Sequence, residues 1–167
     1  PSWLVVTLTL CLGIQAITTD LYLPSLPLIT SDLNSEVSQT QLTLSMLLVF
    51  FGLGQMLAGP ISDRWGRRPT LMISLALYSA SAIGAALSDS MSGLIFWRSL
   101  QGLFMSGSVV CARALPRDLY SPDKAAGAIS KGLTGLGLIA CLSPILGSLL
   151  VGWQGWRMTL VFLSLFG

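Results

Sequence analysis

The feature that most limits the fold of this chain is a pair of long uncharged segments on either side of a small charged loop. Twenty-six consecutive uncharged residues, Val37–Ser62, precede the loop, and twenty more, Pro69–Ser88, follow it. The stretch GPISDRWGRRP, Gly59–Pro69, carries one aspartate and three arginines within six positions. A bilayer core about 30 Å thick needs roughly 20 apolar residues of helix to cross it. The two segments therefore predict two membrane-spanning helices joined by a charged loop at one face.

The rest of the chain has the same apolar character. Of its 167 residues, 53% are hydrophobic and 10% are charged, and the mean hydropathy is +0.76, far outside the range of soluble domains. Inside lipid only helices or closed β-barrels satisfy the backbone, and barrels appear in sequence as short alternating stretches. We therefore predict an all-α membrane protein with five spans and the start of a sixth, at Trp3–Leu28, Gln39–Ser62, Thr70–Leu87, Gly93–Leu115, Gly127–Val151 and Met158–Gly167.

The basic residues predict the orientation of these spans. Short cytoplasmic loops are enriched in lysine and arginine. Here the basic residues gather around the loop between spans 2 and 3 and the loop between spans 4 and 5: Arg64, Arg67, Arg68, Arg113, Arg117, Lys124 and Lys131. The loops at the other face contain Asp32, Glu36, Asp89 and Arg157. We expect both basic loops and the N-terminus to be cytoplasmic. A topogenic anchor with no further role would already explain the three arginines of the charged loop.

Two motifs resemble a known transporter family. The pattern Gly59-x3-Asp63-Arg64-x-Gly66-Arg67-Arg68 resembles the signature loop between helices 2 and 3 of the major facilitator superfamily, and Leu94-x3-Arg98-x2-Gln101-Gly102 resembles its helix 4 motif. The chemistry of the loop is also readable directly. Gly66 permits a tight turn, Pro69 suits the first turn of the next helix, and Asp63 can accept hydrogen bonds from a nearby arginine or an opposing helix N-terminus.

An arginine inside a membrane span is costly and calls for a partner. Asp20 is the expected partner of Arg98, because at 1.5 Å per residue the two lie about 12 Å and about 8 Å from the same face. A carboxylate that alternates between a charged, paired state and a protonated, free state is suited to proton coupling. Two alternatives stay open: Arg98 extends toward the nearby helix end, or Asp20 caps a helix that breaks before Pro24 and Pro27.

Further stretches indicate one branch of the family. DLYLPSLPLI and ARALPRDLY resemble helices 1 and 4 of the drug:proton antiporters of the Bcr/CflA type, and the resemblance covers nearly the whole chain. It implies twelve helices in two six-helix halves, of which this chain is the N-terminal half, with the C-terminal half absent. It also implies an inner-face charge network between Arg67 and Asp118, with the family's partner for Asp63 in the missing half. A solvated loop is the alternative.

The helix 5 motif of these antiporters is only partly present. The family pattern Gly-x3-Gly-Pro-x2-Gly-Gly is matched by Pro144 and Gly147, whereas Ile139, Ser143 and Ser148 stand where glycines are expected. The small residues that remain can serve close helix packing or a seal against proton leak. An internal repeat is also suggested, because RWGRRPTLMISL and WQGWRMTLVFLSL share a glycine, a following arginine and an apolar continuation.

The expected function is proton-coupled multidrug efflux by alternating access, conferring antibiotic resistance, in a bacterial inner membrane. We expect a secondary transporter rather than an enzyme, with hydrophobic drugs, protons, the lipid bilayer and a C-terminal half as partners. Its substrate cavity would lie near mid-membrane between spans 1, 2, 4 and 5. Candidate lining residues, for which ordinary helix packing is the alternative, are Gln15, Thr19, Tyr22, Met46, Gln101, Phe104 and Met105.

Several classes of function find no support in the sequence. There is no histidine, and Cys11, Cys111 and Cys141 lack metal-ligand spacing, so no metal or other cofactor is expected. No phosphate-binding glycine-rich loop occurs, which favours the proton gradient over ATP as energy source. The net charge of +2 reflects topology and predicts no nucleic-acid partner. Two alternatives stay open: an importer of sugars or small metabolites with the same fold, and a non-transporting membrane half-protein.

Overall fold

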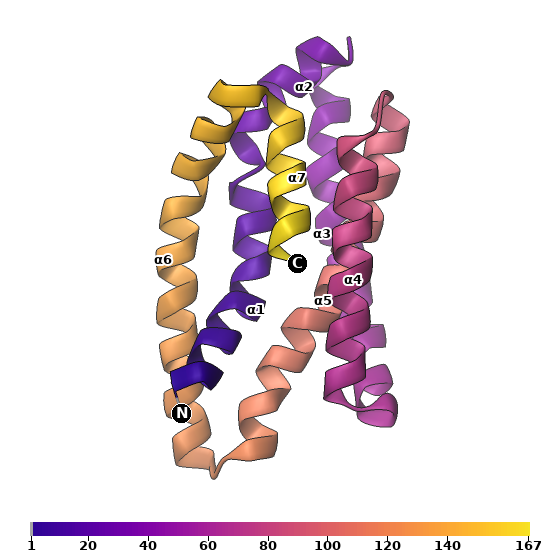
Figure 1. Cartoon of the computed structure of the whole chain (residues 1–167). Coiled ribbons are helices and arrows are strands. Elements are labelled where there is room, and N and C mark those ends of the chain that lie inside the picture. Colours follow the sequence, from indigo (N-terminus) through magenta and orange to yellow (C-terminus); the bar gives the residue numbers. More distant parts are fainter. Residues whose placement is uncertain (1) are drawn as a thin grey trace.

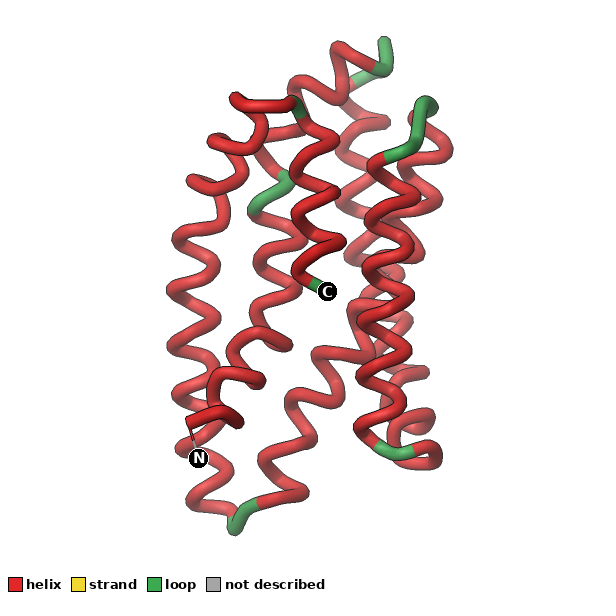
Figure 2. The backbone as a smooth tube through the Cα atoms, in the orientation of Figure 1, coloured by secondary structure: helices red, strands yellow, loops and turns green. Residues whose placement is uncertain are grey.

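The computed structural model describes residues 2–167, which form a bundle of helices lying side by side (Figure 1). Nearly all of these residues are helical, and the short connections between successive spans lie at the two ends of the bundle (Figure 2). The elements are α1 Ser2–Asp20, the 3-10 helix η1 Leu23–Ser25, α2 Leu26–Asp32, α3 Val37–Trp65, α4 Arg67–Ala86, α5 Met91–Leu119, α6 Pro122–Gln154 and α7 Trp156–Phe166. We call the end where α3 meets α4 and α5 meets α6 the basic end.

The predicted membrane spans are confirmed. Within residues 2–167, five helical segments are long and apolar enough to cross a membrane, and α7 is a shorter apolar helix at the expected start of the sixth span. Most helices run a few residues further than predicted, as in α3, which continues to Trp65, and α6, which extends to Gln154. These extensions are polar helix ends that lie beyond the apolar run from which the spans were predicted.

The first span differs from the single continuous helix expected over Trp3–Leu28. α1 ends at Asp20, a 3-10 turn containing Pro24 follows, and α2 begins at Leu26 with Pro27 in its first turn. Proline has no N–H and clashes with the preceding helical turn, so two prolines three residues apart interrupt the α-helix. The break, visible in Figure 2 as a non-helical segment within the first span, is the one that the sequence raised as an alternative role for Asp20.

Close helix approaches depend on two glycines of the predicted motifs. α3 and α4 both pack along α5, and α1 packs along α6. A Cβ at Gly102 of α5 would overlap the backbone carbonyl of Leu47 in α3, and one at Gly147 of α6 would overlap the carbonyl of Leu21. Close packing is therefore what Gly147 provides here, as small residues do in other membrane bundles.

The departure of Ile139 from the helix 5 pattern is balanced on the neighbouring helix. The Cδ1 atom of Ile139 would lie 2.7 Å from a Cβ at Gly13 of α1. A large residue on α6 thus faces a glycine on α1. The two helices can approach closely at this level because the small residue of the pair lies on α1.

The two glycines of the suggested internal repeat have matching conformations. Gly66 has φ 92° and ψ 157°, and Gly155 has φ 81° and ψ −177°. Each joins two helices without any other linking residue, at opposite ends of the bundle, and a positive φ favours glycine at both positions. This equivalence supports the correspondence between the pair α3, α4 and the pair α6, α7.

Candidate functional site

Arg98 lies at the centre of a polar cluster inside the bundle. Its side chain is fully buried, with 0% exposure. Nη1 donates a hydrogen bond to Oε1 of Gln101 at 2.7 Å, and Nη2 donates one to the backbone carbonyl of Thr18 at 3.2 Å. The guanidinium carbon lies 4.0 Å from the centroid of the Tyr22 ring, within range of a cation–π interaction. Arg98 is therefore an interior residue and does not extend to the helix end.

The break in the first span supplies one of these partners. The last four carbonyls of a helix lack intrahelical N–H partners and carry partial negative charge. α1 ends at Asp20, so the carbonyl of Thr18 belongs to this set, and Arg98 occupies it. Pro24 and Pro27 thus create, through the helix break, a backbone acceptor for a buried cation.

Further hydrogen bonds extend the cluster to α3 and α4. The Tyr22 hydroxyl lies 3.0 Å from Oγ1 of Thr43 in α3, and the Tyr78 hydroxyl of α4 lies 2.6 Å from Oγ1 of Thr18. All four side chains are buried. Because Thr18 Oγ1 also bonds the carbonyl of Ile14, the tyrosine hydroxyl is the donor to Thr18. Four helical segments are joined around one guanidinium.

The expected ion pair between Asp20 and Arg98 is not formed, and this prediction is corrected. The structure describes both residues, and no ion pair joins them. Asp20 is half-buried, and its Oδ1 accepts a hydrogen bond from Oγ1 of Thr19 at 3.1 Å. The prediction matched the depths of the two residues but not their directions. Equal depth does not fix the direction of a side chain around the helix axis, and the group of α1 that Arg98 reaches is the backbone carbonyl of Thr18.

A second cluster lies at the basic end, where the predicted pair of Arg67 and Asp118 is formed. Arg67 Nε lies 3.0 Å from Asp118 Oδ2, and Nη1 lies 2.8 Å from Oδ1 of Asp63. Nη1 also donates a hydrogen bond to Oγ of Ser62. Arg67 begins α4, Asp63 lies in the last turns of α3, and Asp118 lies near the end of α5. One guanidinium thus holds three helix ends together; we call this set the Arg67 cluster.

The other residues of the charged loop have separate surroundings. Gly66 makes the tight turn predicted for it, and Pro69 lies in the first turn of α4 as expected. Arg64 and Arg68 are exposed and make no ion pair or hydrogen bond with any residue of the described chain. A Cβ at Gly59 would meet nothing within 4 Å, so packing within residues 2–167 does not require glycine there.

The opposite end carries a cluster that the sequence analysis missed. Trp156 Nε1 donates a hydrogen bond to Oδ2 of Asp32 at 2.9 Å, joining the start of α7 to the end of α2. Arg157 donates to the carbonyls of Ala86 and Ser88 and pairs with Asp89 at 2.9 Å. The repeat offered the signal: Trp156 follows Gly155 as Arg67 follows Gly66, and each bonds an aspartate at the end of another span.

The residues predicted to line a substrate cavity fall into three environments. The side chains of Tyr22, Gln101 and Met105 are fully buried in the bundle. Phe104 lines an apolar pocket between α3, α4 and α5. The remaining three, Gln15, Thr19 and Met46, are half-buried. The structure therefore does not gather the seven residues around one space. In the helix 5 motif, Pro144 is exposed, whereas Gly147 packs against Leu21.

Comparisons with known proteins agree with this arrangement. The family model of the Major Facilitator Superfamily matches residues 8–167. The Chloramphenicol resistance protein of Pseudomonas aeruginosa is 38% identical over 148 residues, which cover 87% of this chain and 35% of that protein. Multidrug resistance protein D of Escherichia coli (strain K12) is 31% identical over 160 residues, which cover 96% of this chain and 41% of that protein. The chain thus spans about two fifths or less of these relatives.

Solved structures share the fold. A bacterial homolog of the human lysosomal transporter Spinster, in an inward-facing and occupied conformation, matches with a TM-score of 0.84 and 19% identity, covering 98% of this chain and 41% of that chain. A D-xylose-proton symporter matches with a TM-score of 0.76 and 16% identity, covering 96% of this chain and 46% of that chain. At these identities the likeness concerns the arrangement of helices alone.

Proposed function

Because this chain belongs to the major facilitator superfamily, we propose that it is the N-terminal part of a proton-coupled multidrug efflux transporter. Relatives named for chloramphenicol resistance and multidrug resistance, at 38% and 31% identity over most of this chain, support the drug-efflux branch. The observation that carries the proposal is the contact between Arg98 and the broken end of α1. It puts a permanent positive charge inside the membrane, beside the helix end that bears Asp20.

Asp20 is the proposed proton carrier. Two residues beyond the carbonyl that Arg98 occupies, it is half-buried and paired with no cation among the described residues. A carboxylate in this position can gain and lose a proton without breaking an ion pair, which is what a proton carrier requires. Drug and proton then compete for the same end of α1, which is the requirement for exchange of one against the other.

Arg98 and the Arg67 cluster have supporting roles in this proposal. Arg98 fixes the end of α1, and with it Asp20, relative to α3, α4 and α5. The Arg67 cluster braces the basic end, which by the distribution of lysine and arginine is cytoplasmic, as is the N-terminus, in a bacterial inner membrane. The half-buried residues Gln15, Thr19 and Met46 are the proposed contributors to a substrate cavity shared with a C-terminal half.

Drug-induced proton release tests the proposal. The full-length protein in detergent, with weak buffering, receives chloramphenicol or the lipophilic cation tetraphenylphosphonium, and a pH indicator records released protons. We expect release from the wild-type protein and none from Asp20→Asn, because the amide does not ionise and so has no proton to release. The matched control is Asp89→Asn, since the Asp89 side chain is 91% exposed at the end of the bundle.

Each contrary result removes a different part of the proposal. If Asp20→Asn releases protons as the wild type does, Asp20 is not the coupling acid. If the wild type binds drug by fluorescence or calorimetry without releasing protons, the efflux is not proton-coupled. Absence of binding of either compound favours the alternative that this fold imports a small metabolite.

A further inference from the structure

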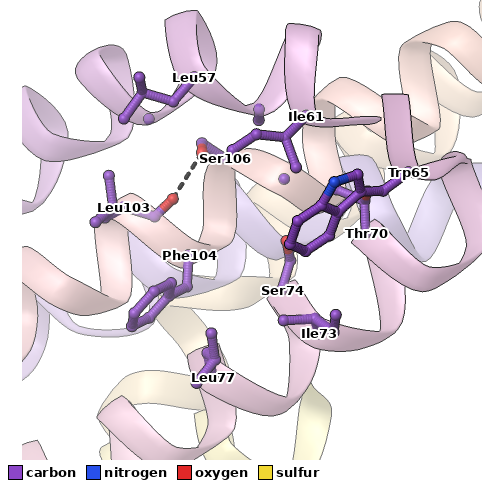
Figure 3. Close-up of a pocket in the computed structure, with 13 residues that line it drawn as sticks. Leu57, Ile61, Trp65, Thr70, Ile73, Ser74, Leu77, Leu103, Phe104 and Ser106 are labelled. Atoms are coloured by element: carbon purple, nitrogen blue, oxygen red, sulfur yellow. Dashed lines mark hydrogen bonds between the residues drawn. The ribbon is translucent and has the colours of Figure 1, made fainter. Parts of the chain in front are cut away.

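An apolar groove runs between α3 and α4, with α5 as its floor. Leu57, Ile61 and Trp65 line it from α3, and Ile73 and Leu77 line it from α4 (Figure 3). Its volume is about 260 Å³. All five side chains are partly exposed at the surface of the bundle, with exposures from 40% for Leu77 to 69% for Trp65. The groove thus opens sideways, on helices that cross the membrane.

The groove exists because α3 and α4 pack on α5 more closely than on each other. A Cβ at Gly54 of α3 would overlap Oγ of Ser106 in α5, and a Cβ at Gly107 of α5 would overlap Oγ of Ser74 in α4. These small residues draw both helices onto α5. The tight turn at Gly66 joins α3 and α4 at the basic end, and the groove lies between their outer faces.

The wall of the groove suits an apolar occupant. Its hydroxyl groups include Ser106 Oγ, which donates to the carbonyl of Leu103 at 2.6 Å, and Thr70 Oγ1, which donates to the carbonyl of Gly66 at 2.9 Å. Both hydrogen bonds stay within the local backbone, so these groups need no partner from a ligand. The remaining surface is mainly aliphatic or aromatic. An extended hydrocarbon chain fits such a surface, whereas a polar metabolite does not.

Positive charge stands at the basic end of the groove. Arg64 follows Leu57 by seven residues, two helical turns, and so lies on the same side of α3. Arg64 and Arg68 are exposed and lack acidic partners among the described residues, whereas Arg67 between them is paired with two carboxylates. Trp65, the last residue of α3 and the neighbour of Arg64 in sequence, lines the groove; tryptophan is common at membrane interfaces.

We propose that this groove is a binding site for an anionic phospholipid. One acyl chain lies between α3 and α4, the glycerol region lies beside Trp65, and the phosphate lies on Arg64 and Arg68. Charge complementarity selects an anionic headgroup, because two unpaired guanidinium groups are free to form hydrogen bonds to phosphate oxygens. The site is separate from Arg98 and requires no transport activity, so it stands independently of the proposed function.

Quenching of Trp65 fluorescence tests the site. The full-length protein is placed in nanodiscs in which brominated phosphatidylglycerol or brominated phosphatidylcholine replaces a rising fraction of the unbrominated lipid. The difference between wild type and Trp65→Phe isolates the emission of Trp65. For the wild-type protein, we expect half-maximal quenching of Trp65 at a lower fraction of brominated phosphatidylglycerol than of brominated phosphatidylcholine. Arg64→Gln should raise that fraction about fivefold, as expected for one arginine at an anionic surface, and Arg64→Lys should restore most of the preference.

Arg113→Gln is the matched control, since Arg113 is an exposed arginine on α5 outside the groove, and it should leave the preference unchanged. Equal quenching by the two lipids would overturn the proposal, because it would indicate an ordinary lipid annulus. Failure of both lipids to quench Trp65 would overturn it as well, because protein would then cover the groove. Loss of the preference for phosphatidylglycerol in Arg113→Gln would also overturn the proposal, because the preference would then be a general effect of net charge.

Discussion

At the level of single residues, the fully buried Arg98 forms no ion pair with any carboxylate among the residues that the structure describes. A buried, unpaired charge is strongly destabilising. Arg98 is instead surrounded by dipoles: the Thr18 carbonyl at a helix end, the Gln101 amide oxygen and the face of the Tyr22 ring. Neutral acceptors of this kind stabilise the cation without cancelling its charge. The guanidinium therefore keeps its positive charge in the interior of the bundle.

Two glycines of the family motifs give opposite predictions for the same substitution. Gly102→Ala places a methyl group into the carbonyl of Leu47, whereas Gly59→Ala meets nothing within 4 Å. We expect Gly102→Ala to lower the stability of the purified protein by about 1–3 kcal/mol, as overpacking does, and Gly59→Ala to leave it equal or slightly higher. Thermal unfolding in one detergent, compared at one scan rate, measures both. Equal transition temperatures for Gly102→Ala and wild type would show that α3 and α5 can separate freely.

The contrast between Arg67 and Asp20 shows which side-chain contacts a sequence can predict. The pair of Arg67 and Asp118 was implied by the family resemblance, and it is formed because both residues lie at helix ends at the same end of the bundle, within reach of each other. The pair of Asp20 and Arg98 was predicted from depth alone. Depth follows from residue count, but direction depends on helix rotation and on where α1 breaks, and these are settled by tertiary packing.

At the scale of helices, the two glycine junctions make the molecule internally symmetric. At one end Gly66 is followed by Arg67, which bonds Asp118 at the end of the fourth span. At the other end Gly155 is followed by Trp156, which bonds Asp32 at the end of the first span. Both contacts start from a residue fixed by a positive-φ glycine, so each junction orients one hydrogen-bond donor toward a helix end. The donor is a guanidinium at the first junction and an indole at the second.

Removal of the indole N–H tests whether this second contact holds α2 in place. Trp156→Phe keeps a buried aromatic ring but cannot donate to Asp32, a loss that we expect to cost about 1 kcal/mol. Amide hydrogen exchange in Leu26–Asp32 should then be about fivefold faster, with no change near Arg67. The matched variant is Trp153→Phe, because Trp153 is 83% exposed and should have no effect. Unchanged exchange in Trp156→Phe would mean that Pro27 and packing alone fix α2.

The helices themselves were largely predictable, and the compensation between them was not. Apolar runs gave all five spans, because hydropathy and length decide which segments enter a membrane. The replacement of a motif glycine by Ile139 suggested a weaker match to the family. That Gly13 makes room for the Ile139 side chain can be seen only when α1 and α6 are known to face each other at that level. A single sequence, considered without those of its relatives, shows the pattern along each helix but not which positions face each other across helices.

At the scale of the whole molecule, each region of the bundle is tied together by a different cluster. The Arg67 cluster joins α3, α4 and α5 at the basic end, the Arg98 cluster joins α1, α3, α4 and α5 in the interior, and Trp156 joins α7 to α2 at the opposite end. We expect a bundle connected in this way to move as one unit. The changes of shape that transport requires are therefore expected between this unit and the rest of the protein, as in transporters built from two halves.

Asp63 is the residue at which this expectation can be tested. Its side chain is 64% exposed, and its pair with Arg67 contributes about 1 kcal/mol or less, since Arg67 keeps Asp118 when Asp63 is changed. The family resemblance implies that Asp63 has a further partner outside this chain, so we expect Asp63→Asn to leave folding and drug affinity within twofold of wild type but to slow transport about tenfold. Efflux from proteoliposomes and drug binding by calorimetry measure the two effects separately.

Asp89→Asn, the same change in an exposed aspartate at the opposite end, should transport normally. Wild-type efflux in Asp63→Asn would leave the aspartate as a local partner of Arg67 and would mean that the conformational change does not depend on it.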